Sequence, residues 1–359
     1  MKTLTLNIAC FFILFTFSAT MLNAQGCIAI RNMMSCTGGN PNSLSSLTHP
    51  GQFQLTTSYR YFHSFRHFRG DHEEANRVAE GTEVINDSHS IDFGLSYTLN
   101  DRWSLSINLP VNFNRRSSLY EHYGNSEESN PEHMRFATGS AGISDLRVAA
   151  TYWVLDPATH MHGNFAIGLG IKAPTGKSTV KDVFHKRTNS GADSTITKFV
   201  DQSIQLGDGG WGASIELQGY QTITPALSLY YNGFYLFNPK GVNEANLSVP
   251  DQYAGRLGVS YAALPALGLA LNLGGRIEGL PAIDIFGSSE GSRRPGYIVS
   301  VEPGLLWNSG AHTFGFSVPV ALYRNRIKSY SDRQDPTGQK HGDAAFADYL
   351  ISANYAYRF

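Results

Sequence analysis

Apolar and polar residues alternate with a period of two along most of the chain. In the first such segment the odd positions carry Phe53, Leu55 and Tyr59, and the even positions between them are polar. The same alternation returns over residues 90–99. Successive side chains of a β-strand point to opposite faces, whereas a helix would scatter this pattern around its circumference. The pattern therefore predicts strands with one apolar face and one polar face.

The alternation predicts about twelve strands, and their length indicates where they lie. The strands cover residues 51–63, 88–99, 103–114, 142–154, 164–174, 210–223, 226–238, 252–262, 267–279, 296–307, 312–325 and 346–359. A tilted strand needs roughly 9–11 residues to cross the hydrocarbon of a membrane, while strands of soluble proteins usually have about 5–6 residues. The length of the segments therefore favours strands that span a membrane.

The connections between these strands alternate between short and long. The short ones are residues 99–101, 155–163, 224–225, 263–266 and 308–310. The long ones are polar and cover residues 64–87, 115–141, 175–209, 239–251, 280–295 and 326–345. Short periplasmic turns and long outer loops are typical of outer-membrane barrels. We therefore expect an all-β fold, a single transmembrane antiparallel β-barrel over residues 51–359 with both termini in the periplasm.

The last predicted strand carries aromatic residues up to its end. Its alternating series is Tyr349, Ile351, Ala353, Tyr355, Tyr357 and Phe359. An alternating strand that closes on a terminal Phe resembles the signal by which outer-membrane barrels are recognised. We therefore expect the barrel assembly machinery and outer-membrane lipid as partners. Aromatic residues near strand ends, which would form interfacial girdles, are Tyr59, Tyr61, Trp103, Tyr152, Trp307, Tyr355 and Tyr357.

The first residues resemble a secretory signal. Lys2 provides the positive charge, residues 8–17 form a short apolar stretch, and residues 22–24 provide a small-residue cleavage site. We therefore predict a signal peptide over residues 1–24. Residues 25–50 have weak periodicity, and a periplasmic tail and a hatch inside the barrel both remain open. Within this segment Cys27 and Cys36 are expected to form a disulfide after export.

The amino-acid composition agrees with a barrel, and the net charge bears on the kind of partner to expect. Charged residues make up only 16% of the chain, aromatic residues 12%, and there are 36 glycines. No apolar run in the sequence reaches the roughly 18 residues that mark a transmembrane helix. The net charge of −1 gives no reason to expect nucleic acid as a partner.

The polar face of the predicted strands would line the lumen. Its charged members are Arg60, Asp92, Asp145, Arg147, Lys172, Glu216, Arg256, Arg276, Glu278, Glu302 and Arg358. Two interpretations remain open: a polar pore with a charged constriction, or ladders of ion pairs that fill the barrel. Buried charges persist only when paired, so both predict pairing. Because proline cannot donate a ladder hydrogen bond, a strand irregularity that opens the wall is expected near Pro174, Pro303 or Pro319.

The sequence offers little support for catalysis. Residues 173–178 lack the first glycine of a phosphate loop, because Ile171 occupies that position. His63, His67 and His72 lie in and beside a predicted loop and lack a compact metal-ligand spacing. No nucleophile motif such as G-x-S-x-G occurs. We therefore expect no enzyme activity, cofactor or metal. A catalytic site formed by residues that are distant in the sequence stays an alternative.

Three stretches resemble a known family. Residues 142–147, 167–177 and 200–212 resemble the outer-membrane barrel family named for the meta-pathway of phenol degradation, which is distantly similar to FadL/TodX-type channels for hydrophobic compounds. The resemblance implies a channel or transporter for hydrophobic or aromatic compounds, whereas the charged lumen favours small polar or amphiphilic solutes. FadL-type channels have more strands and a helical plug, which this sequence does not clearly contain. Passive passage of small solutes is the expected function. A structural or interaction barrel that uses its long loops is the alternative.

Overall fold

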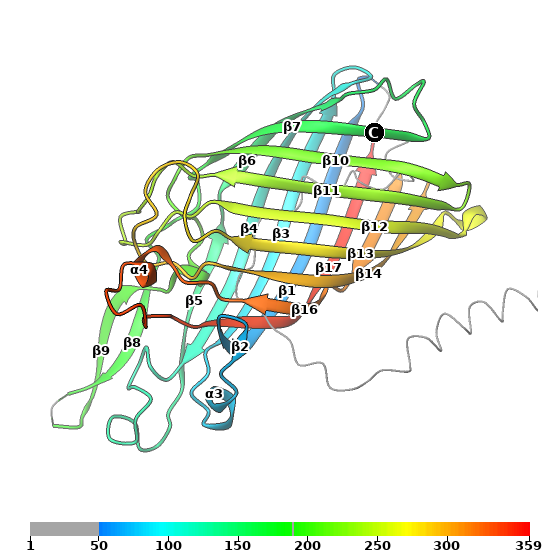
Figure 1. Cartoon of the computed structure of the whole chain (residues 1–359). Helices are drawn as coiled ribbons and strands as arrows, with labels where there is room; N and C mark the ends of the chain where they lie inside the picture. Colours follow the sequence, from blue (N-terminus) through cyan, green and yellow to red (C-terminus); the bar gives the residue numbers. More distant parts are fainter. Residues whose placement is uncertain (1–49, 189) are drawn as a thin grey trace, which may run out of the picture.

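A computed structural model describes residues 50–188 and 190–359 (Figure 1). The predicted signal peptide over residues 1–24, nearly all of the segment 25–50 and the expected pair Cys27 and Cys36 lie outside the described residues. Among the described residues, no helix is long and apolar enough to cross a membrane.

The described chain forms a closed antiparallel barrel of twelve strand positions. In order around the barrel these are β1 (Phe53–Arg69), β3 (Ile85–Thr98), β4 (Trp103–Ser118), β5 (Phe136–Ile143) with β6 (Leu146–Trp153), β7 (Gly163–Ala173), β10 (Gly212–Thr224), β11 (Leu227–Phe237), β12 (Gln252–Leu264), β13 (Leu269–Leu280), β14 (Gly296–Ser309), β15 (His312–Ser317) with β16 (Val320–Asn325), and β17 (Ala344–Arg358). Pairing of β17 with β1 closes the barrel. The predicted fold is confirmed.

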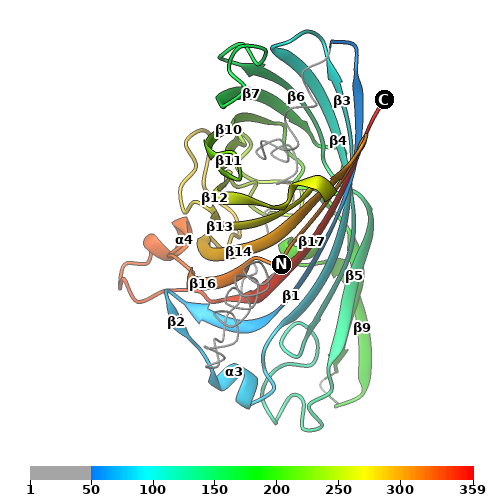
Figure 2. The same ribbon diagram turned by 90° about the vertical axis from the view of Figure 1, so that its right-hand side faces the viewer.

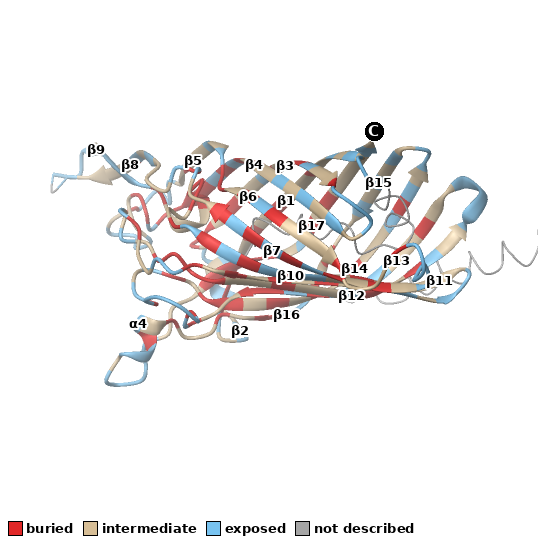
Figure 3. Cartoon of the chain, turned by 90° about the horizontal axis from the view of Figure 1, so that it is seen from above, coloured by how far each residue is buried: buried red, intermediate tan, exposed pale blue. Residues whose placement is uncertain are grey.

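The alternation along each strand separates two environments (Figure 3). Leu105 on β4 and Leu169 on β7 are 42% and 64% exposed on the outside of the barrel. Polar residues of the opposite register, such as Arg147 and Glu216, are buried inside. A barrel with an apolar exterior and a polar interior is stable in lipid, because each of the twelve strand positions has a neighbour on both sides, although β5 itself pairs only with β4, and because apolar side chains meet the hydrocarbon.

Within residues 50–188 and 190–359, two strand positions of the wall are each divided into two segments. Between β5 and β6 the chain leaves the ladder at Ser144 and Asp145, and the amide of Ser144 donates to the carbonyl of Pro110 at 2.8 Å. The second interruption contains Pro319, which has no amide hydrogen and separates β15 from β16. Pro303 on β14 accepts from the amide of Val318 at this second interruption, whereas Pro174 directly follows the end of β7. Two of the three prolines thus lie at a wall irregularity.

The long connections contain more structure than the sequence suggested. β1 and β4 run beyond their predicted ends, to Arg69 and Ser118. The predicted loop 175–209 contains a hairpin of β8 (Lys181–Arg187) and β9 (Asp193–Phe199) and the 3-10 turn η2 (Gln202–Ile204). Figure 1 shows this hairpin at the end of the barrel opposite the C-terminus.

The remaining elements are short. They are β2 (His72–Glu73), α3 (Asn76–Ala79), η3 (Pro265–Leu267) and α4 (Tyr330–Arg333). At the end with the short turns, Phe53 and Phe359 exchange backbone hydrogen bonds of 2.9 and 3.0 Å. Apolar side chains also pack within the described barrel near its long loops, where Phe68, Ile298 and Phe346 form a buried cluster. Apolar packing therefore covers part of the interior near the long loops.

Candidate functional site

Residues 200–209, which we call the plug segment, run through the barrel interior near the long loops. The side chains of Val200, Ile204 and Leu206 are almost completely buried. On one side, the hydroxyl of Ser144 donates to the carbonyl of Leu206. On the other side, Gln202 donates to the carbonyl of Ser248, in the connection between β11 and β12, at 2.7 Å. The plug segment thus links wall segments that are not neighbours in the barrel.

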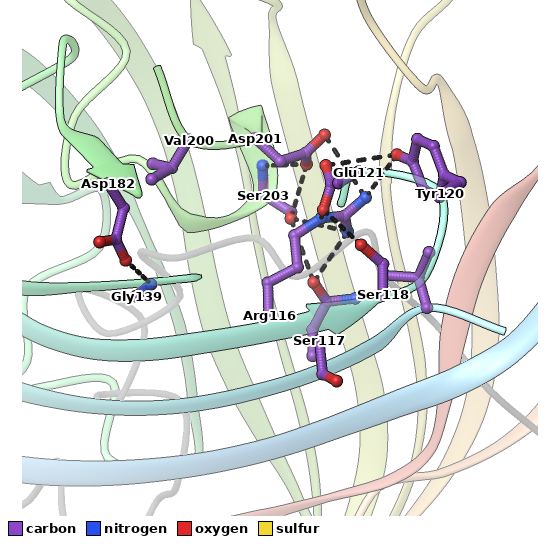
Figure 4. Close-up of polar contacts among 12 residues, drawn as sticks. Arg116, Ser117, Ser118, Tyr120, Glu121, Gly139, Asp182, Val200, Asp201 and Ser203 are labelled. Atoms are coloured by element: carbon purple, nitrogen blue, oxygen red, sulfur yellow. Dashed lines mark hydrogen bonds and ion pairs between the residues drawn. The ribbon is translucent and has the colours of Figure 1, made fainter. Parts of the chain in front are cut away.

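Asp201 anchors the plug segment to two arginines. Its carboxylate accepts from the guanidinium of Arg294 at 2.8 and 2.5 Å and lies 3.5 Å from that of Arg116. Arg294 belongs to the connection between β13 and β14, whereas Arg116 lies on β4. Figure 4 shows Asp201 and Ser203 turned toward Arg116, and Ser203 donates to Asp201 through its amide and hydroxyl at 2.9 and 2.7 Å.

Charge compensation explains why this buried carboxylate stays ionised. Burial raises the pKa of Asp201, but the positive charges of Arg116 and Arg294 outweigh burial and hold that pKa well below its ordinary value. Arg116 also pairs with Glu121 at 2.9 Å and donates to the hydroxyl of Tyr120 at 2.9 Å. We call Arg116, Glu121, Asp201 and Arg294 the latch, because together they tie the plug segment to both sides of the barrel.

The β8–β9 hairpin is docked beside the plug segment. The amide of Gly139 on β5 donates to Asp182 at 2.8 Å, as Figure 4 shows. The rings of Phe136 and His185 stack with centroids 3.8 Å apart, and the amide of His185 donates to Nδ1 of His122 at 3.1 Å. Burial lowers the pKa of His122 to about 4, so its ring is neutral at neutral pH. The hairpin therefore docks on a neutral histidine.

A cavity of about 120 Å³ lies between the plug segment and the barrel wall. Its lining combines charged with apolar side chains, including Arg60, Lys172, Asp208, Phe62, Leu206 and Leu280. Asp145, at the interruption of the wall, also lines the cavity and accepts from the amides of Gly176 and Asp208 at 2.9 and 3.1 Å. Lys172 pairs with Asp208. A ligand with an apolar body and a polar end would find both kinds of contact here.

The predicted lumen residues form further ion pairs. Arg147 on β6 bonds to Glu216 on β10 at 2.7 Å. Arg276 pairs with its strand neighbour Glu278 at 2.5 Å and lies 3.9 Å from Glu302. Glu302 also meets Arg256 at 3.1 Å. The side chains of Arg276, Glu278 and Glu302 are 1–7% exposed, so this group occupies space within the barrel.

The other three predicted lumen residues are Arg60, Asp92 and Arg358. Arg60 lines the cavity beside the plug segment. Asp92 on β3 is 5% exposed, and the nearby positive charges that act on it are Arg60 and Arg147. Arg358 lies near the short turns, where its guanidinium donates to the carbonyl of Gly310 at 3.1 Å. The structure therefore gathers most predicted lumen residues inside but leaves Arg358 at the opposite mouth.

Sequence reasoning missed the latch. Arg116, Glu121, Asp201 and Arg294 all fall in segments that lacked alternation and were predicted to be loops. The available signal was the stretch 200–212, which carried the family resemblance but had no alternation of its own. Ion pairs between distant segments leave no periodic trace in a sequence.

Comparison with known proteins agrees with the barrel architecture. No family model matches the chain, so the resemblance to the meta-pathway family stays a prediction. The crystal structure of an outer membrane channel from Pseudomonas putida F1 is similar at 12% sequence identity and a TM-score of 0.55, covering 87% of this chain and 96% of that one. The chain is an outer-membrane β-barrel.

Two further solved structures align less well. The toluene transporter TodX of P. putida shares 10% identity, with a TM-score of 0.42 and coverage of 94% of this chain and 99% of that one. The β domain of the Bordetella autotransporter BrkA shares 13% identity, with a TM-score of 0.44 and coverage of 86% and 100%. At such identities the likeness to the P. putida F1 channel shows the fold alone, and the two lower scores add no argument.

Proposed function

We propose that the protein is a passive outer-membrane channel for small hydrophobic or amphiphilic compounds. The observation that carries the proposal is the mixed cavity beside the plug segment, where Phe62, Leu206 and Leu280 lie close to Arg60 and Lys172. Ligand sites typically combine apolar walls with a few placed polar groups. The solved channel from P. putida F1 has the same fold and supports passage as the role of this barrel.

Pairing of the interior charges supports gated passage rather than a permanently open polar pore. The pairs Arg147–Glu216 and Arg276–Glu278 and the latch lie inside the barrel, where a water-filled bore would have to run. An open ion pathway requires groups that bind a passing ion weakly and release it. Charges that already satisfy one another do not offer such sites.

The interruption between β5 and β6 gives a candidate side route. Ser144 and Asp145 lie at this interruption and also line the cavity. Gly142, just before it, has φ +150°, and a Cβ atom there would lie 3.1 Å from the side chain of Leu206. Movement of the plug segment would therefore remove the side chain packed behind the wall at this point. An apolar compound in the cavity would then meet a gap in the strand pairing.

A second candidate function is an interaction barrel that uses its long loops. Its support is the β8–β9 hairpin, which is packed and carries the exposed apolar side chains Val183, Ile196 and Phe199. The mixed cavity has no role in that alternative. For this reason the channel is the better-supported function.

Equilibrium binding of labelled octanoate to the purified protein tests the proposal. Octanoate has an apolar chain and one carboxylate, and we expect saturable binding to the wild type. Leu206→Trp should abolish it, because the larger ring fills the cavity of about 120 Å³. Asp101→Asn, an exposed turn residue at the other end of the barrel, is the matched control and should bind like the wild type. Binding that Leu206→Trp leaves unchanged would place the ligand elsewhere and contradict the proposal.

A further inference from the structure

A row of polar side chains crosses the outside of the barrel on the three adjacent strands β1, β3 and β4. Register pairs His63 on β1 with Asp87 on β3, Asp87 with Arg115 on β4, and Arg115 with Gly139 on β5. Arg115 shares its register with the exposed residues Leu105, Ile107 and Phe113, so it points outward. Figure 2 shows β1, β4 and β5 along one side of the barrel. We call His63, Asp87 and Arg115 the outer polar row.

The outer polar row begins where the apolar exterior of β4 ends. Outward residues on β4 are apolar from Trp103 to Phe113. At about 3.3 Å per residue this stretch is roughly 33 Å long, and a strand tilt near 40° reduces its height to about 25 Å. The apolar band of outer-membrane barrels has about that height. Arg115 therefore lies at the level of the lipid headgroups, on the side of the long loops.

Arg115 is exposed, and within the described chain it has neither a hydrogen-bond nor an ion-pair partner. Its nearest acidic neighbour in the row is already engaged. Asp87 lies 2.6 Å from Nδ1 of His63 and accepts from the hydroxyl of Tyr61 at 3.3 Å. The guanidinium of Arg115 thus keeps its capacity for bidentate bonding to an oxyanion.

The surface next to Arg115 is hollowed. A shallow groove of about 560 Å³ is bordered by Arg115, His89 and Phe113, and its far side is formed by the small residues Gly139 and Ala141. Asp87 also borders the groove, where its carboxylate bonds to His63. Nδ1 of His89 bonds to the hydroxyl of Tyr59 at 2.7 Å, so the other ring nitrogen is the one left for a ligand. The groove combines a cation with an apolar ring at the membrane boundary.

We propose that this groove binds a phosphorylated lipid of the outer leaflet. The phosphate would accept from Arg115 and His89, and the acyl chains would lie along Phe113 and the apolar band below it. Charge complementarity and the place of the groove on the lipid-facing wall favour a lipid over a soluble anion. An arginine on the lipid-facing wall is well tolerated near the interface, whereas it is strongly destabilising at the bilayer midplane. The site is independent of the route through the barrel.

Native mass spectrometry of the purified barrel with added lipid A tests the site. The wild type should retain one phosphorylated lipid A, and Arg115→Gln should reduce its affinity at least about tenfold, since a charge-assisted bidentate bond is lost. Arg69→Gln, which changes an exposed arginine near the end of β1 that pairs with Glu74, is the matched control. Heat-modifiable gel mobility verifies that each variant is folded.

Two further arms separate the sources of phosphate. Lipid A without phosphate should bind the wild type as weakly as phosphorylated lipid A binds Arg115→Gln. Inorganic phosphate at millimolar concentration should not displace the lipid, because it lacks the acyl contacts. Equal retention by wild type and Arg115→Gln, equal binding of the dephosphorylated lipid, or full displacement by inorganic phosphate would each overturn the proposal.

Discussion

Asp201→Asn removes the one carboxylate that joins Arg116 to Arg294, and it keeps the size of the side chain. In the wild type this carboxylate is ionised at neutral pH because the two guanidinium groups hold its pKa low. The substituted amide still accepts from Ser203 but no longer neutralises either arginine. We expect the plug segment to leave its closed position more often, while the barrel itself stays folded.

The magnitude follows from the burial of the three side chains. Asp201 is 10%, Arg116 3% and Arg294 29% exposed. Removing one partner of a buried ion pair costs about 3–5 kcal/mol. Arg116 keeps its ion pair with Glu121, and Arg294 is partly solvated. We therefore expect Asp201→Asn to destabilise the closed position of the plug segment by about 2–3 kcal/mol. That loss raises the ratio of open to closed plug roughly 30- to 150-fold, since about 1.4 kcal/mol corresponds to a factor of ten.

Single-channel recording in a planar bilayer measures this ratio. The wild type should be silent or open briefly, and Asp201→Asn should raise the ratio of open to closed time roughly 30- to 150-fold. Asp101→Asn, at the opposite end of the barrel, should behave as the wild type. An open probability of Asp201→Asn within a factor of about three of the wild type would refute the latch, provided that heat-modifiable mobility shows a folded barrel.

Three other predictions follow from the same contacts. Leu169→Arg, on the lipid-facing wall, should cost about 2–4 kcal/mol of unfolding free energy in lipid vesicles, whereas Met161→Arg in an exposed turn should cost less than about 1 kcal/mol; equal costs would show that the assigned register is wrong. Arg276→Gln should lower the free energy of unfolding in urea titrations by about 3–5 kcal/mol, because Glu278 and Glu302 lose their shared cation. A loss no larger than that caused by substituting an exposed arginine would contradict a stabilising role of this buried ion-pair group. A neutral His122 stabilises the docked hairpin fully above its ordinary pKa of 6.5, and this contribution is lost as the pH falls toward 4; the protection factor for hydrogen exchange at the amide of His185, which is the measured rate corrected for the intrinsic rate at each pH, should therefore fall over that window in the wild type and stay constant in His122→Phe.

The membrane-spanning part of the barrel was predictable because each strand there separates lipid from a polar interior. Alternation at Leu105 and Leu169 reports that separation directly. The strands continue beyond it, and there both faces of β4 carry polar residues, with Arg115 on the outer face and Arg116 on the inner face. Once lipid no longer contacts one face, the pattern that marks a strand disappears, so the predicted strands ended too early.

The plug segment was not predictable for a different reason. Its apolar residues Ile204 and Leu206 are too few for a periodic pattern, and its position depends on Arg116 and Arg294, which are distant in the sequence. The interior position of the charged residues Arg147 and Glu216 could be predicted, because their place in the alternating strands fixes the direction of their side chains. Which charge meets which partner depends on strand stagger across the barrel, which a single sequence does not contain.

Uptake into proteoliposomes tests the channel most directly. Vesicles containing the wild-type barrel should accumulate labelled octanoate with saturable kinetics above the rate of protein-free vesicles, whereas labelled sucrose should enter no faster than it enters protein-free vesicles. Leu206→Trp should lower octanoate uptake toward the protein-free rate because it fills the cavity beside the plug segment. Octanoate uptake equal to that of protein-free vesicles, or rapid sucrose entry through the wild type, would contradict a gated channel for hydrophobic or amphiphilic compounds.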